Sequence, residues 1–206
     1  MSNDPYRITS FDDLRKRIGE PNPVTPQKVF DALDDQMSAY VARAPFCLLA
    51  TSDADGKLEI SPKGDGPGFV LMEDSRTLVV PDRKGNKLLF GMRNILANPH
   101  VALIFMIPGT GETLRVSGRA ELSVDPALLE KLSARGQPAL VAIRVAIDHC
   151  FFHCPRAFLR AELWQAEKWA EPLRISMGRQ LAPRIGGDAT LAEQIDSRLA
   201  KGVKDL

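Results

Sequence analysis

The chain has 206 residues, of which 44% are hydrophobic and 26% charged, as is ordinary for a globular protein with a buried core. Its 27 basic residues nearly balance 26 acidic ones, so the net charge of +1 gives no broad field for a nucleic acid or an anionic membrane. With no membrane-length apolar run, no signal-peptide pattern and three cysteines that cannot all pair within one chain, we expect a cytoplasmic protein.

Residues 1–45 are expected to form a helical extension at the edge of the fold. Apolar residues recur at helical spacing over residues 11–18, which predicts a short first helix. Thr25 and Pro26 have the form of an N-cap and a first helical residue, and the apolar spacing then continues to Tyr40. We therefore expect a second helix whose apolar face covers the β region that follows.

From residue 46 to 147 the pattern changes to short apolar or alternating runs separated by turn sequence, which is typical of antiparallel strands. Asp125 and Pro126 interrupt the runs with the start of a short helix that extends to about Ala134, and Gly118 marks a bulge or bend in a long strand. The expected strands cover residues 46–52, 57–61, 69–72, 77–80, 100–107, 112–122 and 140–147. Six or seven such strands with isolated helices predict a small barrel or closed sheet.

The basic turn at residues 83–86 is the strongest local signal for a ligand site. It follows an apolar strand, and we expect a helix over residues 87–97 to begin directly after it. The first N–H groups of a helix lack intrahelical partners and favour negative charge. Arg83 and Lys84 add full charges and Asn86 is placed to cap the helix, so the turn is predicted to bind a phosphate. The alternative is a solvated turn that only caps a helix.

Other chemical signals are weaker. His149, Cys150, His153 and Cys154 are zinc-ligand residue types, but adjacent His-Cys pairs do not easily converge on one tetrahedron, so we expect no metal. The glycines before residue 69 are not a dinucleotide fingerprint, because a strand follows them instead of a helix. Neither a nucleophile elbow nor a P-loop occurs, which gives hydrolase and nucleoside triphosphatase functions no residues to use.

Six short motifs occur in order between residues 20 and 170. They are Ser61-Pro62-Lys63-Gly64-Asp65, Pro81-Asp82-Arg83-Lys84-Gly85-Asn86, Arg93-Asn94-Ile95, Asn98-Pro99, the run from Gly111 to Ala120, and Phe152-His153-Cys154-Pro155-Arg156-Ala157 with Leu159-Arg160 and Leu163-Trp164. In this order they are specific. The chain resembles the pyridoxamine 5′-phosphate oxidase-related, FMN-binding split-barrel family, in the branch marked by a Pro-Asp-basic-x-Gly-Asn turn.

The resemblance implies a mainly β, α+β fold: an antiparallel split barrel of six to seven strands with peripheral helices, assembled as a homodimer. It implies one domain over residues 1–206, with a helical extension (1–45), the barrel core (46–147) and a C-terminal segment (148–206) at the dimer cleft. FMN would lie in each groove between the subunits. The implied cofactor-binding residues are Ser61, Pro62 and Lys63 near the flavin; Val80, Arg83, Lys84, Asn86 and Lys87 at the phosphate turn; and Arg115, Arg160 and Trp164 at the cleft.

The function implied by the resemblance is an FMN-binding oxidoreductase that uses a small-molecule substrate and possibly NAD(P)H. The Arg-x-His pattern of the true oxidase is absent from residues 156–164, so vitamin B6 oxidation is not expected. Two alternatives stay open at this point: a non-catalytic flavin carrier or sensor, and a split barrel that binds a deazaflavin or haem. No residue of the sequence identifies the substrate or a catalytic group.

Overall fold

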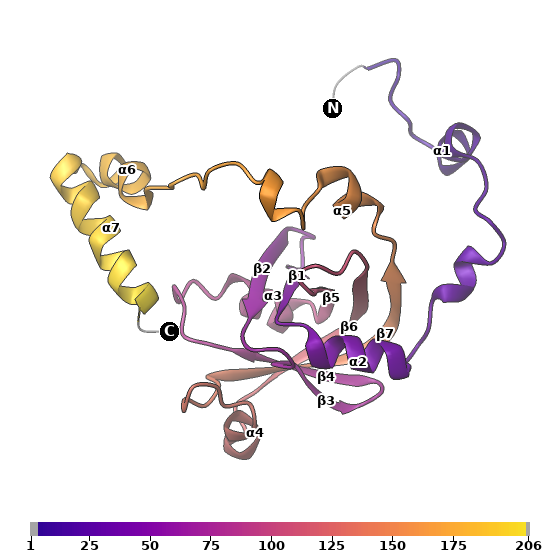
Figure 1. Cartoon of the computed structure of the whole chain (residues 1–206), viewed down its shortest axis with the longest axis horizontal. Coiled ribbons are helices and arrows are strands. Elements are labelled where there is room, and N and C mark those ends of the chain that lie inside the picture. The colour runs from indigo at the N-terminus through magenta and orange to yellow at the C-terminus, as the bar shows by residue number, and fades with distance from the viewer. Residues whose placement is uncertain (1–3, 205–206) are drawn as a thin grey trace. The chain divides into compact units, whose positions relative to one another are not determined.

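The computed structural model describes residues 4–204, which divide into two compact units. The first unit ends at Trp164 and the second begins at Gln165 (Figure 1). The first unit contains the whole sheet, and the second contains only helices. The expected plan of one domain with boundaries at residues 45 and 147 stays a prediction.

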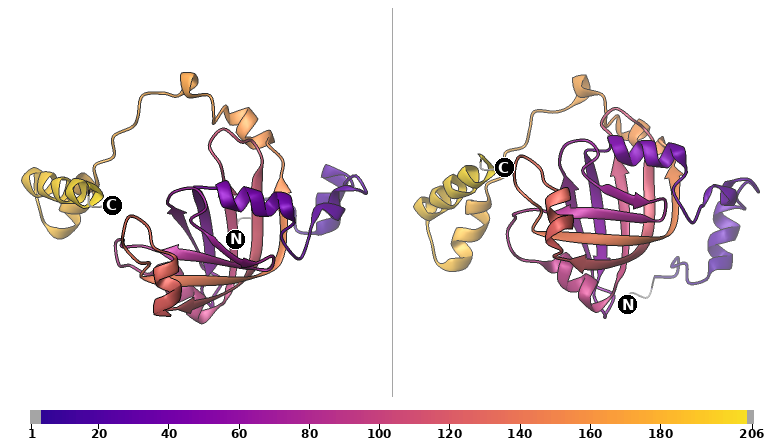
Figure 2. Two further views of the ribbon diagram at one scale, coloured as in Figure 1. Left: turned by 60° about the horizontal axis from the view of Figure 1, so that its bottom comes forward. Right: turned by 90° about the horizontal axis from the view of Figure 1, so that it is seen from below.

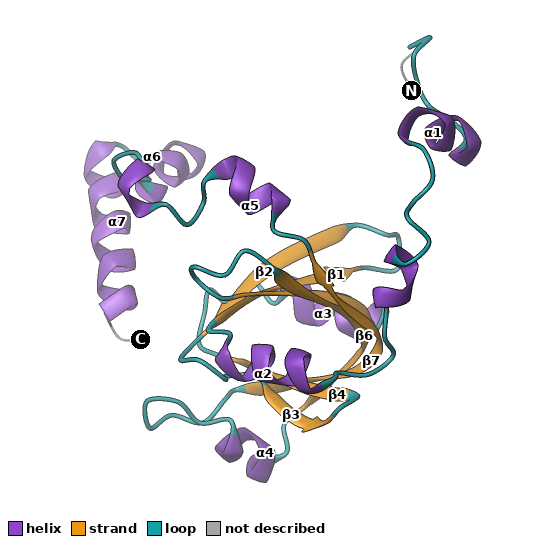
Figure 3. Ribbon diagram, turned by 45° about the vertical axis from the view of Figure 1, so that its right-hand side comes forward, coloured by secondary structure: helices purple, strands orange, loops and turns teal. Residues whose placement is uncertain are grey.

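The first unit is built on one sheet of seven strands, in which every neighbouring pair is antiparallel. The spatial order is β2-β1-β5-β6-β7-β4-β3, and the sheet curls into a barrel whose hydrogen-bond ladder does not close (Figure 3). The prediction of a split barrel is confirmed. The strands are β1 (Phe46–Ser52), β2 (Leu58–Gly64), β3 (Leu71–Asp74), β4 (Thr77–Asp82), β5 (His100–Met106), β6 (Thr113–Ser123) and β7 (Val141–His153).

Three strands run further than their patterns predict. β2 continues through Pro62 and β4 through Pro81, although a proline usually ends a strand. Both positions lie where the strand has a neighbour on one side only: β2 pairs only with β1, and β4 has lost its β3 partner after Val79. β7 continues to His153 because Cys150 still points into the core while His149 stays outside, so the alternation persists through a polar stretch.

The helices of the first unit are α1 (Phe11–Ile18), α2 (Asp35–Arg43), α3 (Phe90–Ala97), α4 (Pro126–Lys131) and α5 (Arg156–Ala161). α2 and α3 lie at opposite ends of the barrel (Figure 2). α2 inserts Met37 and Val41 into the central core, and α3 inserts Ile95 into the same core. The two ends of the barrel are thereby covered, and the inward side chains of its strands are excluded from water.

Three helix starts or ends differ from the predictions. The single helix expected from residue 26 is a 3₁₀ turn (Thr25–Lys28) and then α2, because the Asp34 carboxylate accepts from the Met37 N–H at 2.7 Å and starts a new helix. α3 begins at Phe90 and not at residue 87, and α4 ends at Lys131. The last helix is capped by Asp188, whose carboxylate accepts from the Leu191 N–H at 3.0 Å.

The predicted irregularity at Gly118 is confirmed as a shift in the β6–β7 register between residues 117 and 118. The backbones approach so closely there that a Cβ on this glycine would lie 2.0 Å from the carbonyl oxygen of Ala146. Only glycine fits this position without a backbone shift. The bulge lets β6 and β7 bend together around the core.

The second unit contains α6 (Met177–Leu181), a 3₁₀ turn (Ala182–Ile185) and α7 (Ala189–Lys204). Gly178 allows α6 to approach α7, since a Cβ there would lie 1.9 Å from the carbonyl oxygen of Ala192. The Asp196 carboxylate accepts from the Gly178 N–H at 2.7 Å, which ties the two helices together. Over residues 4–204 no helix has both the length and the apolar character of a membrane span; the cytoplasmic location stays a prediction.

Candidate functional site: a cavity at the open edge of the barrel

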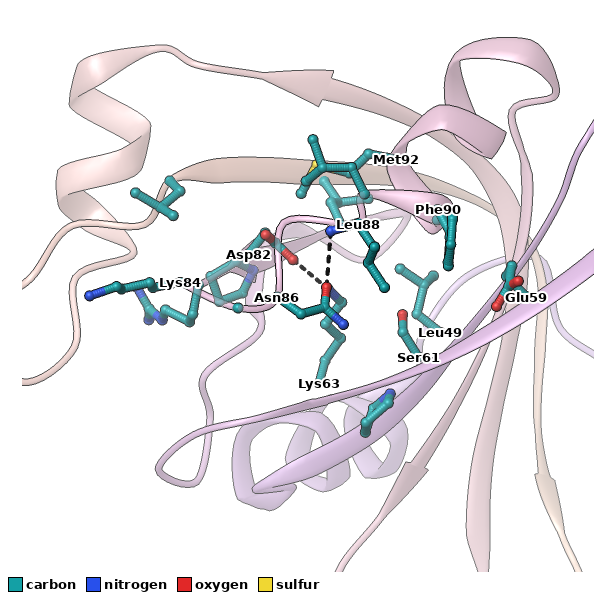
Figure 4. A pocket seen from close by; sticks show the side chains of 18 of the residues that line it. Leu49, Glu59, Ser61, Lys63, Asp82, Lys84, Asn86, Leu88, Phe90 and Met92 are labelled. Atoms are coloured by element: carbon teal, nitrogen blue, oxygen red, sulfur yellow. Dashed lines mark hydrogen bonds and ion pairs between the residues drawn. The ribbon is translucent and has the colours of Figure 1, made fainter. Parts of the chain in front are cut away.

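The candidate site is a cavity of about 590 Å³ between β2 and the segment that joins β4 to α3 (Figure 4). Its volume lies within the roughly 300–1,000 Å³ range of small-molecule sites. The lining residues are Leu49, Phe69, Leu140, Ile143, the β2 residues 59–64 and the continuous segment 81–92. The cavity is therefore formed where the barrel is split.

One wall of the cavity comes from alternate residues of β2. Ser61 pairs with the buried Leu49 of β1, so Glu59, Ser61 and Lys63 point to the inner side of the sheet (Figure 4). At about 3.3 Å per strand residue, these three side chains span about 13 Å. Leu58 and Ile60 point outward and are 74% and 63% exposed. The inner side of β2 is thus polar and its outer side apolar, the reverse of an ordinary barrel strand.

The opposite wall is the basic turn and the loop after it. Four lining side chains are basic (Lys63, Arg83, Lys84 and Lys87), whereas two are acidic (Glu59 and Asp82). The cavity therefore has an excess of positive charge in a protein whose total charge is close to neutral. A local excess of positive charge of this kind favours an anion at the cavity.

Two ion pairs cross the open edge of the barrel next to this cavity. The Lys63 ammonium of β2 pairs with the Asp82 carboxylate of β4, and both side chains are largely buried. One residue beyond the end of each strand, Arg83 Nε donates to Asp65 Oδ2 at 3.2 Å. We call these four residues the seam. Arg135 lies further from Asp65, at 3.8 Å, and is 64% exposed.

The seam leaves one donor unused. Arg83 Nη1 is buried and has no hydrogen-bond partner among the described residues, although Nε of the same guanidinium is paired with Asp65. A buried donor without a partner is costly, and such groups are rare in folded proteins. Since Arg83 lines the cavity, an anionic oxygen bound there would satisfy this donor.

The loop after the turn has an unusual backbone. Lys87 and Leu89 adopt left-handed conformations, with φ of 62° and 57°, which non-glycine residues seldom do. This break prevents the helix from starting at residue 87. Asn86 does not cap α3; its side-chain oxygen accepts from the Leu88 N–H at 3.0 Å instead. The first intrahelical bond runs from the Arg93 N–H to the Leu89 carbonyl, at 2.9 Å.

α3 nevertheless starts at the cavity wall. Phe90, Gly91 and Met92 line the cavity, and in an α-helix the N–H groups of these first residues have no intrahelical acceptor. The helix therefore starts three residues later than predicted, and its start lies at the cavity wall. The loop also exposes apolar side chains at the rim, with Leu88 and Leu89 each 57% exposed.

The structure brings seven of the predicted cofactor residues together around the cavity: Ser61, Pro62, Lys63, Arg83, Lys84, Asn86 and Lys87. Four lie elsewhere. Val80 is fully buried in the core, and Arg115 is on the outer side of β6, 5.4 Å from the ring of Phe151. Trp164 donates from its indole N–H to the Thr110 carbonyl at 2.8 Å, and Arg160 is an exposed residue of α5. Their roles toward a cofactor stay predictions.

Sequence reasoning missed the acidic members of the site. Asp65 and Asp82 both occur in the quoted motifs, but a single carboxylate next to a turn has no sequence pattern that gives it a role. Glu59 could have been found from strand alternation, because it lies two and four residues before Ser61 and Lys63 on the same side of β2. The ion pairs themselves link distant parts of the sequence and have no local signal.

Neither buried thiol is suited to act as a nucleophile. Cys47 lies opposite Lys63 in the β1–β2 register, and burial raises its pKa to about 12 despite the nearby ammonium. Burial likewise raises the pKa of Cys150 to about 11. A thiolate is the reactive form, so both are inert at neutral pH. The described residues contain no group of three or more His, Cys, Asp or Glu side chains placed to hold a metal.

Residues 33–154 match the family model described as pyridoxamine 5′-phosphate oxidase, which is more than half of the chain. The chain belongs to this family. The part that matches the pyridoxamine 5′-phosphate oxidase family runs from just before α2 to the end of β7, so it contains all seven strands and the whole cavity lining. The second unit lies outside it.

No curated protein matches the chain. Among solved structures, it is similar to the HupZ protein of Group A Streptococcus, with 18% identity, a TM-score of 0.48, and 58% of this chain and 93% of that chain covered. It is also similar to a putative pyridoxamine 5′-phosphate oxidase from Lactobacillus delbrueckii, with 24% identity, a TM-score of 0.46, and coverage of 59% and 95%. A third is a Clostridium acetobutylicum protein related to general stress protein 26, with 15% identity, a TM-score of 0.45, and coverage of 58% and 86%.

Proposed function

We propose that this member of the pyridoxamine 5′-phosphate oxidase family binds FMN in the cavity at the open edge of its barrel and acts as an oxidoreductase. The observation that carries the proposal is the buried, unpartnered Nη1 of Arg83 on the wall of a cationic cavity. A phosphate has three oxygens that accept charge-assisted hydrogen bonds, so it would supply the acceptor that Arg83 Nη1 lacks.

The remaining lining fits the rest of the cofactor. Lys84 and the free N–H groups at the start of α3 would bind phosphate together with Arg83. Apolar residues such as Leu49 and Phe69 would contact the flavin ring, while Ser61 offers a hydroxyl at mid-length of the cavity. Bound FMN supplies the electron and hydride chemistry, and the protein positions it and excludes water.

The energetics of this arrangement are sufficient. Charge-assisted hydrogen bonds contribute roughly 1.5–3 kcal/mol each. Two basic side chains and two backbone donors would thus provide a large share of the ~8 kcal/mol that corresponds to micromolar affinity. Burial of the ring against the apolar lining provides the rest.

We also propose that the protein works as a homodimer. Large apolar side chains on the outer side of β2 and on α3 are exposed in one chain: Leu58, Ile60 and Leu96 are 74%, 63% and 78% exposed. Large exposed apolar side chains on elements that border a cavity favour a surface that another protein covers. NAD(P)H is the proposed electron donor, with a small molecule as the acceptor.

The test is the absorption spectrum of the purified protein, followed by titration of the apoprotein with FMN and light scattering of the same sample. We expect a yellow protein of two chains per particle, micromolar or tighter FMN affinity, and bleaching by NADH or NADPH. Protein that stays colourless after FMN titration contradicts the proposal. Flavin binding without turnover by any donor and acceptor identifies a carrier or sensor, and a deazaflavin or haem spectrum identifies a different occupant of the barrel.

A further inference from the structure

We infer that Asp65 is a positioning residue for the cofactor site: it orients Arg83 so that Nη1 is presented to the phosphate. The inference rests on the proposed function, because the phosphate is that of FMN. It goes beyond that function by giving a role to a carboxylate that does not line the cavity.

The geometry of Asp65 is that of a fixed acceptor. Its side chain is only 12% exposed, and it follows directly on β2. Its own N–H donates to the Pro45 carbonyl at 3.1 Å, and its Oδ1 accepts from the Gly66 N–H at 2.9 Å. The carboxylate is therefore held by the backbone before any ligand binds. Its Oδ2 remains for Arg83 Nε.

Arg83 needs such a partner. It follows the last residue of β4, in a turn that has no regular hydrogen-bond ladder, and its long side chain has many rotamers in solution. The bond from Nε to Asp65 fixes the plane of the guanidinium and so fixes the direction of the remaining N–H groups. Without it, the ordering cost would fall on phosphate binding.

The negative charge of Asp65, taken alone, predicts the opposite effect on FMN affinity. Asp65 is an anion close to a phosphate site, so its removal should raise the local positive potential and tighten FMN binding. Positioning predicts that its removal weakens FMN binding. The charge effect and the positioning effect therefore predict opposite changes in FMN affinity when Asp65 is removed.

The experiment measures the affinities of apoprotein for FMN and for riboflavin, which lacks the phosphate, by quenching of flavin fluorescence. For Asp65→Ala we expect FMN to bind about tenfold more weakly, with riboflavin affinity unchanged. Asp65→Asn keeps an acceptor oxygen for Nε, so we expect FMN affinity within about threefold of the unmodified protein. In an Arg83→Ala background, Asp65→Ala should cause no further loss, because the pair acts as one unit.

Glu73→Ala is the matched control. It removes a carboxylate that pairs with both Nε and Nη2 of Arg144, at 2.8 and 2.9 Å, outside the cavity lining. Both flavins should bind it as they bind the unmodified protein. Tighter FMN binding by Asp65→Ala, or an equal loss for both flavins, overturns the positioning role. If the unmodified protein binds no FMN, the proposed function fails and this inference fails with it.

Discussion

β6 and β7 on one side of the barrel, and β2 and β4 on the other, are joined in different ways. The β6–β7 pair is a continuous ladder over residues 113–123 of β6, interrupted only by the bulge at Gly118. β2 and β4 meet through the ion pairs of the seam, with a cavity beside them. Backbone ladders depend little on side-chain identity or on salt, whereas ion pairs depend on both.

Because of this difference, we expect one side of the barrel to contribute mainly to folding stability and the other mainly to ligand affinity. The ladder side carries the inward apolar residues, among them Val116 and Val145, which are 1% and 0% exposed. The seam side carries the charges and the unpartnered donor. We therefore expect changes on the ladder side to alter the free energy of unfolding, and changes at the seam to alter ligand affinity.

The largest expected effect is a difference in reaction rate among the three cysteine thiols, which lie in different parts of the barrel. Cys47 lies beside the seam, Cys150 lies in the ladder side, and Cys154 is exposed. At pH 8 a thiol with a pKa of about 12 is ionised in about one molecule in ten thousand. We expect Cys154 to react with a thiol reagent at least about a hundredfold faster than either buried thiol, measured by mass spectrometry of modified peptides.

Which of the two buried thiols reacts first tests whether the seam opens in solution. From pKa alone, Cys150 should react before Cys47, because its pKa is raised only to about 11. Faster reaction of Cys47 would show that the seam opens in solution and that the two sides do differ in rigidity.

Both buried thiols also contribute to the free energy of unfolding at neutral pH, and this contribution declines as the pH rises from about 9 towards 11–12.

A smaller effect is expected from Gly118→Ala on the ladder side. The added methyl group would meet the Ala146 carbonyl oxygen, so the β6–β7 backbones must separate. We expect a loss of about 2–3 kcal/mol in the free energy of unfolding, measured by urea denaturation. Gly66→Ala is the control, since a Cβ there has no neighbour within 4 Å. Equal stability of the two variants would contradict the close approach in the bulge.

The smallest effect is expected at the cavity. The double substitution Arg83→Ala, Lys84→Ala should weaken FMN binding by at least about tenfold, which corresponds to at least about 1.4 kcal/mol, with little change in the urea midpoint. The control pair Lys57→Ala, Arg119→Ala removes two positive charges outside the cavity lining and should leave the affinity unchanged. An unchanged affinity in the Arg83, Lys84 variant would place the phosphate elsewhere.

The ladder side was largely predictable because local alternation determines it. The strands at residues 100–107 and 112–122 were expected within a few residues of their observed bounds, since apolar side chains alternate or run together there. The bulge at Gly118 was also expected, because a glycine inside a strand has few other uses. At Val101, Phe105 and Val116, burial and β-propensity agree.

The seam side was less predictable because tertiary contacts override local signals there. Pro62 and Pro81 suggested strand ends, yet both strands continue. Lys87 suggested a helix start, yet its left-handed backbone delays the helix to Phe90. The basic turn lines the cavity, and its binding of a phosphate stays a prediction. The pairing of Asp65 with Arg83 joins residues 18 apart in the sequence, and no periodicity indicates it.

The two prolines have a consequence for aggregation and for the survival of the cavity. Each interrupts the row of amide donors on a strand bordering the gap, and the β1–β2 register runs unbroken through Pro62. The missing donors therefore face the gap and not the neighbouring strand. Backbone pairing between β2 and β4 across the gap is therefore disfavoured. Pairing of either strand edge with a strand of another molecule is disfavoured for the same reason. The same two imino acids that disfavour unwanted sheet growth thus keep the gap open beside the cavity in which we propose that FMN binds.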